Sequence, residues 1–199
     1  MAQQAGLFEE RCRVLVDDWS GRIAYYPALF DSAQSARYFD VLQREISWAQ
    51  EHMWMYDRTV EVPRLVASFL SGEALPGALT AMQTCVGELL GERFNSVGLN
   101  YYRRAGDSVA WHNDHAGELV AQPVIALVSL GCVREMRVRS KSRPRTTFSC
   151  DLEPGSVFVM SGRSQEFWEH HIPKCSRAID ARISVAFRQR PERLQKAIP

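Results

Sequence analysis

Long apolar runs, paired cysteines and an excess of charge of one sign are all missing from this sequence. No stretch approaches the roughly 20 uninterrupted apolar residues that a membrane-spanning helix needs, and Met1 to Glu10 lack the apolar core of a signal peptide. The five cysteines lie far apart and include no C-x-x-C pair, which argues against structural zinc and against a disulfide framework. We therefore expect a cytoplasmic protein with reduced thiols and no membrane partner.

Internal repeats, low-complexity segments and flexible linkers are also missing. A chain of 199 residues with 46% hydrophobic and 24% charged residues has the composition of a globular protein. This length suits one domain with a substantial core. We expect a single domain over residues 1–199, with a monomer as the default state.

The small net charge of +1 hides an uneven distribution. Residues 131–150 hold six basic side chains, among them Arg143 and Arg145, against the single acid Glu135. Segregation of this kind places a cationic surface beside an otherwise neutral body. It indicates a polyanionic partner better than the net charge does, although a bare charge run is more often a solvated hairpin.

The order of the expected elements is helices first and strands afterwards. Apolar residues recur every three or four positions in residues 31–51 and 76–91, which predicts two helices, and residues 59–72 suggest strand and loop. From Ser96 onward, short apolar or alternating runs predict strands over residues 97–102, 109–111, 124–130, 133–138, 146–150, 157–160 and 183–187. We expect a mainly β protein of the α+β class, with helices packed on an antiparallel sandwich or barrel.

A candidate metal site begins at His112 and Asp114. On an extended strand these two side chains leave the same face and can share one metal ion. A third ligand is available downstream at His170 or His171. Two histidines with one carboxylate are typical of non-haem Fe(II) oxygenases, with zinc as the main alternative metal.

Two arginines near the end of the chain form a candidate anion site. Arg182 and Arg188 lie six positions apart, so on a strand they share a face with Ser184 and Ala186. These small residues leave room for a ligand. The two guanidinium groups could bind a small dianion such as a dicarboxylate, unless one or both are solvated cations.

Taken together, these motifs resemble the AlkB family of Fe(II)/2-oxoglutarate dioxygenases. The resemblance runs from about Ile23 to Arg190 and is closest to the branch that repairs alkylated nucleic acid. Five separated motifs carry it: Asn100-Tyr101-Tyr102, Trp111-His112-Asn113-Asp114, Ser129-Leu130-Gly131, Trp168-Glu169-His170-His171-Ile172-Pro173, and the stretch from Arg182 to Arg188. The Pro63-Arg64-Leu65 segment before the core also matches.

The resemblance implies a fold and a reaction. It implies a double-stranded β-helix (jelly-roll) core over residues 96–190, with helices and a nucleotide-recognition lid in residues 1–95 and a tail over 191–199. The implied reaction is oxidative demethylation of N-alkylated bases in DNA or RNA, which consumes 2-oxoglutarate and O2 at Fe(II) and releases formaldehyde, succinate and CO2.

The resemblance also implies roles for particular residues. The family's metal ligands carry over to His112, Asp114 and His170, so His171 becomes a neighbour. The implied 2-oxoglutarate contacts are Asn100, Tyr102, Arg182 and Arg188, although Tyr102 could simply be a core residue with its hydroxyl satisfied.

Contacts with the nucleic acid are expected from a second group of residues. Phe69 follows Pro63-Arg64 at the family's aromatic position and could stack on a flipped base opposite His112, but it could equally be an ordinary core residue. Arg64 is also expected to contact the substrate, and Arg143 and Arg145 are expected to contact phosphates of the nucleic acid.

Two departures from the family pattern affect this expectation. His115 stands where many family members carry a second acid that contacts the damaged base, and Ser184 and Ala186 replace an amide and a hydroxyl in the final strand. His115 motivates the alternative of the same oxygenase chemistry on a protein or small-molecule substrate. Ser184 and Ala186 motivate the alternative of a nucleic-acid binding module without turnover.

Overall fold

Two antiparallel sheets form the body of the protein. The computed structural model describes residues 12–191 apart from 56 and 115. The large sheet has eight strands, in the spatial order β1 (Arg13–Asp18), β2 (Gly21–Tyr26), β10 (Val157–Ser161), β7 (Ile125–Gly131), β12 (Arg182–Arg188), β5 (Ser96–Tyr102), β4 (Arg58–Phe69) and β3 (Ala49–Met55). The small sheet has four, in the order β6 (Val109–His112), β11 (Trp168–Ile172), β8 (Arg134–Ser140) and β9 (Thr147–Leu152).

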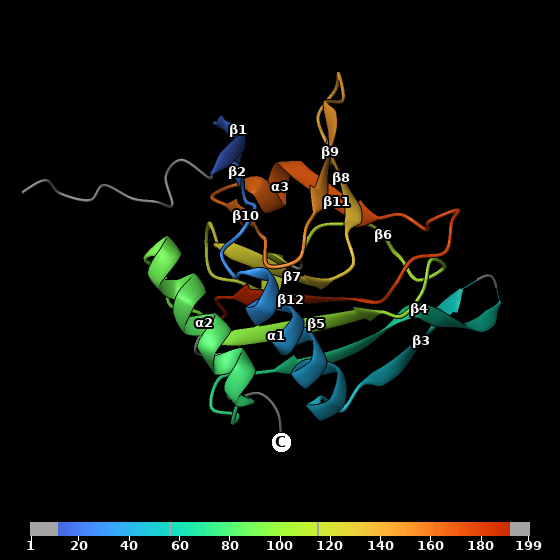
Figure 1. The fold of residues 1–199 in the computed structure, drawn as a ribbon. Helices are drawn as coiled ribbons and strands as arrows, with labels where there is room; N and C mark the ends of the chain where they lie inside the picture. Colours follow the sequence, from blue (N-terminus) through green and yellow to red (C-terminus); the bar gives the residue numbers. More distant parts are fainter. Residues whose placement is uncertain (1–11, 56, 115, 192–199) are drawn as a thin grey trace, which may run out of the picture.

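The helices and the small sheet lie on opposite sides of the large sheet. Figure 1 shows α1 (Ser32–Glu45) and α2 (Gly77–Leu90) on one side and the hairpin of β8 and β9 on the other. Two short helices, α3 (Ser164–Phe167) and the 3-10 turn η2 (Ala116–Glu118), complete the described elements. No helix in the described part of the chain is long and apolar enough to cross a membrane. The expected mainly β fold with outer helices is confirmed.

Strand alternation divides the apolar residues between two cores. On β12, Ile183, Val185 and Phe187 pack with residues of α1 and α2, whereas Ala186 packs with residues of the small sheet. This is the period of two that an extended backbone imposes. The space between the sheets therefore receives the even-numbered side chains of β12, as the sequence predicts.

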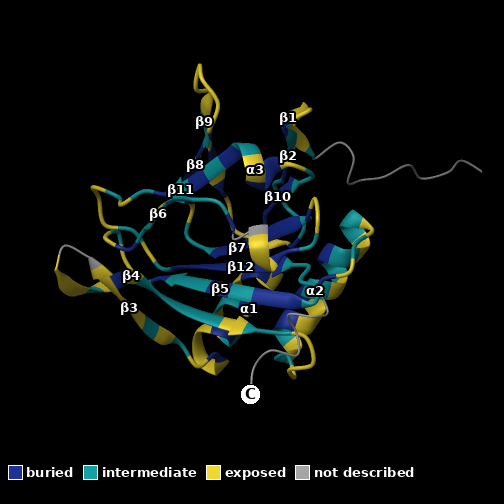
Figure 2. Cartoon of the chain, turned by 180° about the vertical axis from the view of Figure 1, so that it is seen from behind, coloured by how far each residue is buried: buried dark blue, intermediate teal, exposed yellow. Residues whose placement is uncertain are grey.

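Burial is greatest in the middle of the large sheet. In Figure 2, β7, β10 and β12 are mostly dark blue, while the tips of the β3–β4 and β8–β9 hairpins are yellow. A strand with both faces covered reads as a continuous apolar run, which is why β7 and β10 are visible in the sequence. The exposed hairpin tips lie outside both cores.

The first helix ends earlier than its apolar pattern predicts. A capping box between Asp31 and Gln34 starts α1, and Ile46 takes an extended conformation (φ −79°, ψ 131°) that stops it after Glu45. Residues 49–55 form strand β3 instead, so the expected helix over 31–51 is wrong over residues 46–51. The apolar spacing continues past Ile46, but pairing with β4 outweighs it.

An irregular pairing between β3 and β4 accommodates Pro63. Gln50 pairs with Leu65 and His52 pairs with Glu61, so residues 62–64 lie opposite Glu51 alone. A bulge of this kind suits proline, which has no amide hydrogen for the ladder. The strand therefore runs through Pro63, where the sequence suggests strand and loop. The side chains of Arg64 on β4 and Glu51 on β3 project from the two strands at this bulge.

Candidate active site

Three side chains form a cluster that can hold a metal ion. His112 at the end of β6 pairs directly with His170 on β11, so both rings leave the same face of the small sheet with their centroids 4.3 Å apart. Asp114 follows two residues after His112, and ligand atoms of all three residues lie within 4.8 Å of one another. Among the described residues, this is the cluster with metal-ligand chemistry and spacing.

The histidines are held in the form that binds metal. Burial, followed by the nearby His112, lowers the pKa of His170 to about 3, so its imidazole is neutral and offers a lone pair. The Nδ1 atom of His112 lies 2.8 Å from the carbonyl oxygen of Ala110, which favours a proton on Nδ1 and leaves Nε2 for the metal.

Asp114 is buried as an anion because its partners compensate its charge. Burial alone raises the pKa of this carboxyl, but the cation of Arg188 and its hydrogen bond to the carboxylate outweigh burial, and the pKa lies below its ordinary value. Arg188 donates from Nε to Asp114 Oδ2 over 2.9 Å. The backbone N–H of Asp114 donates to Gln165 Oε1 over 2.8 Å, which fixes the chain beside the carboxylate.

His171 points away from this cluster, because adjacent residues of a strand face opposite sides. Its ring stacks on Trp111 with centroids 3.9 Å apart, and the Arg139 guanidinium lies 4.0 Å from the centre of the Trp111 ring. This stack covers the outer face of the strands that carry the ligands. The structure thus brings His170 to the metal cluster and gives His171 a packing role.

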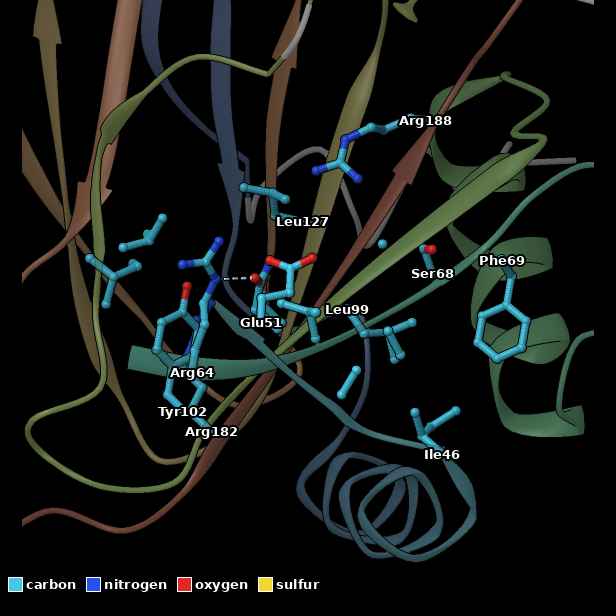
Figure 3. Close-up of a pocket in the computed structure, with 18 of the residues that line it drawn as sticks. Ile46, Glu51, Arg64, Ser68, Phe69, Leu99, Tyr102, Leu127, Arg182 and Arg188 are labelled. Atoms are coloured by element: carbon cyan, nitrogen blue, oxygen red, sulfur yellow. Dashed lines mark hydrogen bonds between the residues drawn. The ribbon is translucent and has the colours of Figure 1, made fainter. Parts of the chain in front are cut away.

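A cavity of about 870 Å³ contains the cluster and reaches α1 and the β3–β4 hairpin. This volume is at the upper end of the range for small-molecule sites. All three metal-cluster residues line it, as do the four candidate cosubstrate residues Asn100, Tyr102, Arg182 and Arg188. Figure 3 shows Tyr102, Arg64 and Arg182 together at one end of the cavity and Phe69 at the other.

Arg182 is a buried cation with unused donors. It is 1% exposed, and its Nε donates to Ser129 Oγ over 2.8 Å. Its two Nη atoms are buried and make no hydrogen bond to any described residue. Buried donors without partners are costly, and a guanidinium fork matches a carboxylate, so Arg182 fits one carboxylate of a bound acid.

Asn100 and Tyr102 are oriented as donors beside Arg182. Arg64 donates from Nε to Asn100 Oδ1 over 2.6 Å, which leaves the amide NH2 group of Asn100 available to a ligand. Burial raises the pKa of Tyr102 despite the opposing charges of Arg182, Arg64 and Arg134, so its hydroxyl remains protonated. The sequence assigns Arg64 to the nucleic acid, and the structure shows that it also positions Asn100.

Arg188 passes over β5 where that strand has no side chain. A Cβ atom added to Gly98 would lie 2.5 Å from Nη1 of Arg188. Glycine at this position therefore lets Arg188 reach Asp114. Of the neighbouring Ser184 and Ala186, which the family pattern would replace with larger polar residues, Ser184 lines the cavity between the arginines and Ala186 packs in the core beside the small sheet.

The expected nucleic-acid contacts are dispersed. Phe69 lines the cavity and also packs against the helix-side core, whereas Arg143 and Arg145 are exposed near the tip of the β8–β9 hairpin and do not line the cavity. His115 lies outside the described residues. The nucleic-acid contacts of these residues stay predictions.

Sequence reasoning missed three residues around this site. Gln165 is 2% exposed and positions Asp114. Arg134 is 1% exposed and its guanidinium lies over the Tyr102 ring. Glu51 lines the cavity. Gln165 belongs to a four-residue helix, which is too short to show a period. Arg134 lies in the cationic segment, and its burial is invisible in a count of charges.

Comparison with known proteins identifies the family. Residues 70–188, more than half of the chain, match the family described as the 2OG-Fe(II) oxygenase superfamily. The chain belongs to this superfamily. A crystal structure of an oxidoreductase of the 2OG-Fe(II) oxygenase family from Burkholderia pseudomallei has the same fold, with a TM-score of 0.56, 19% identity and 85% of each chain covered.

Curated relatives include alkB homologs. The chain is 28% identical over 187 residues to the alpha-ketoglutarate-dependent dioxygenase alkB homolog 3 of Homo sapiens. The aligned region covers 84% of this chain and 65% of that protein. The chain is also 28% identical over 205 residues to the DNA oxidative demethylase ALKBH2 of Arabidopsis thaliana, covering 83% and 65%. The chain thus spans slightly less than two thirds of the length of these relatives. The resemblance to the AlkB family is confirmed.

The residues present fit the two groups that the superfamily name implies. Two imidazoles, of which His170 is held neutral, and one ionised carboxylate are the donor set of a facial Fe(II) site. The unpartnered Nη donors of Arg182 fit a carboxylate of 2-oxoglutarate. The expected cofactors Fe(II) and 2-oxoglutarate are therefore supported by both family and geometry.

His112 on β6 and His171 on β11 provide a test of the metal site. His112→Ala should weaken Mn(II) binding, measured by calorimetry on the folded protein, by at least roughly 100-fold, because it removes one of three ligands. His171→Ala, which disturbs the stack with Trp111 on the outer face, should change binding by less than about threefold. A larger loss in His171→Ala than in His112→Ala contradicts the assignment.

Arg182→Met tests the carboxylate site. We expect it to weaken 2-oxoglutarate binding to the Mn(II)-loaded protein by about 100-fold, because two charge-assisted hydrogen bonds are lost. Its thermal midpoint should stay within a few degrees of wild type, since methionine replaces a buried cation with unused donors. Arg163→Met, which changes an exposed arginine, is the control and should leave 2-oxoglutarate affinity unchanged. Unchanged 2-oxoglutarate affinity in Arg182→Met contradicts this role.

Proposed function

We propose that the protein is an oxidative demethylase of N-alkylated bases in nucleic acid. One observation carries the proposal: the metal cluster and the unused donors of Arg182 share a cavity large enough for a cosubstrate and a base. Its family membership and the names of its relatives, dioxygenase alkB homolog 3 and DNA oxidative demethylase ALKBH2, support the same activity.

The residues divide the work between binding and orientation. When bound, Fe(II) with 2-oxoglutarate and O2 supplies the oxidant that hydroxylates an N-alkyl carbon, after which the hydroxyalkyl group leaves as an aldehyde. Arg182 binds one carboxylate of the cosubstrate, while the amide of Asn100 and the hydroxyl of Tyr102 donate hydrogen bonds to it. Arg188 holds Asp114 through the Nε–Oδ2 bond, so that the carboxylate keeps its orientation.

The remaining part of the cavity is available to the base. Its walls are the β3–β4 hairpin and the segment that joins β4 to α2, and they include Phe69, Leu75 and Ala67. A base must leave the helical stack to reach a site of this kind. The apolar wall around Phe69 provides a surface on which it could stack, as the sequence predicts.

The β8–β9 hairpin is the proposed contact with the phosphate backbone. Arg143 and Arg145 are exposed near its tip, and no described acidic side chain forms an ion pair with either. The hairpin belongs to the small sheet and projects on the side of the large sheet opposite α1 and α2 (Figure 1). An exposed pair of unpaired cations suits a polyanion, whose binding is then salt-dependent.

Coupled product release tests the activity. Protein prepared without O2 and then given Fe(II), 2-oxoglutarate, air and a single-stranded oligonucleotide with one 3-methylcytosine should release formaldehyde and succinate in equal amounts. The unmethylated oligonucleotide is the control. Succinate without formaldehyde contradicts the nucleic-acid substrate and favours oxygenation of a protein or small molecule, whereas neither product, with normal metal binding, contradicts turnover altogether.

Neutralising the hairpin tests the phosphate contact. In the double variant Arg143→Gln/Arg145→Gln, the dependence of oligonucleotide affinity on salt should weaken. The magnitude of the slope of log affinity against log salt should decrease by about two, roughly one for each lost phosphate contact. The charge-matched control is Arg37→Gln/Arg93→Gln, which changes exposed arginines on and after the helices. An unchanged slope in the hairpin variant removes these residues from the interface.

A further inference from the structure

Apart from Asp114, which pairs with Arg188, the charged side chains that line the cavity are sorted by depth. Arg182 is 1% exposed and the side chain of Arg188 is 20% exposed, so these cations lie deep. Glu45 and Glu51 also line the cavity, but both are exposed at its rim. Because Asp114 compensates Arg188, the unpaired charge at the floor is the cation of Arg182, whereas the mouth is negative.

The acids near the metal cluster are already neutralised. Asp114 pairs with Arg188 over 2.9 Å, and Glu118, the next carboxylate along the chain, pairs with Arg190 over 2.8 Å. By contrast, the Glu51 carboxylate has no ion pair or hydrogen bond among the described residues; the side chain of Gln50 donates only to the backbone carbonyl of Glu51. Its negative charge is available to a ligand.

The backbone directs Glu51 toward the cavity. Ala49 and Glu51 alternate on one face of β3 and both line the cavity, while the side chain of Gln50 between them donates to the carbonyl oxygen of Val62 over 2.6 Å. The bulge opposite Glu51 adds to this orientation, because bulges re-aim neighbouring side chains. Figure 3 shows the Glu51 side chain extending from β3 over the cavity, on the side where Arg64 lies.

Arg64 does not neutralise Glu51, although both residues line the same wall. The Nε atom of Arg64 is engaged by Asn100 Oδ1 over 2.6 Å, and the two charged groups form no ion pair within 4.0 Å. Arg64 thus belongs to the positive floor with Arg182. A ligand that spans the cavity meets positive charge at one end and negative charge at the other.

We propose that Glu51 is a specificity-determining residue that favours bases carrying a positive charge. This inference rests on the proposed function. A base methylated at the ring nitrogen of a cytosine is cationic at neutral pH, whereas N3-methylthymine of similar shape is neutral. The Glu51 carboxylate attracts the former and accepts a hydrogen bond from its amino group, while the deep arginines remain reserved for the anionic cosubstrate.

The test compares two substrates in one protein. For wild type, kcat/KM is measured on single-stranded oligonucleotides that carry one 3-methylcytosine or one 3-methylthymine. Glu51→Gln should reduce the ratio of the two values by about fivefold, mainly through KM for 3-methylcytosine, which is the effect expected for one partly exposed charge pair. Glu51→Asp should recover part of the preference.

Controls separate this inference from the proposed function. Glu88→Gln, an exposed change of the same charge on α2 outside the cavity, should leave the ratio unchanged. An unchanged ratio in Glu51→Gln, or an equal loss on both bases, overturns the role of Glu51 while demethylation stands. Wild-type protein that acts on neither base overturns the proposed function, and this inference with it.

Discussion

Alternation along β12 is the constraint on which the site depends. Because successive side chains leave opposite faces, the odd-numbered residues anchor the helices while Arg182 and Arg188 enter the space between the sheets. A shift of one residue in the pairing of β12 with β5 and β7 would exchange the two sets. Seven paired positions with β5 hold this register, so the same hydrogen bonds that build the sheet also place the two cations.

Charge compensation then makes the site stable before any ligand binds. The Asp114 carboxylate is buried, but Arg188 offsets the cost of removing its charge from water, while Gln165 accepts a hydrogen bond from the backbone N–H of Asp114. His170 is kept neutral by burial. Arg182 is the exception, because its buried Nη donors have no partner among the described residues. The uncompensated charge lies where an anionic cosubstrate of this superfamily would bind.

Several elements were visible in the sequence and several were not. The strands β7 and β10 were predicted because both of their faces are covered and their apolar runs are continuous. The strands β5 and β12 were predicted from short apolar or alternating runs. β1, β2 and β11 were not predicted. β1 is exposed at both ends and β11 has three polar residues among five, so neither shows a clear apolar run, and all three take their strand geometry from a neighbour. The last turn expected of α1 became β3 for the same reason, since pairing with β4 is a long-range interaction that no local pattern records.

By itself, the sequence determined what local backbone geometry can determine. It placed His112 with Asp114 and Arg182 with Arg188 on common faces, because the period of a strand is a property of the backbone alone. The residue types alone left His170 and His171 open and the family resemblance favoured His170; the tertiary structure supplies the physical reason, which is the pairing of His170 on β11 with His112 on β6. It also decided that Arg64 holds Asn100, that Gln165 holds Asp114, and that Glu51 remains unpaired over the cavity. Those contacts join segments 36 to 51 residues apart, or depend on a bulge between two strands, and only the folded chain brings such groups together.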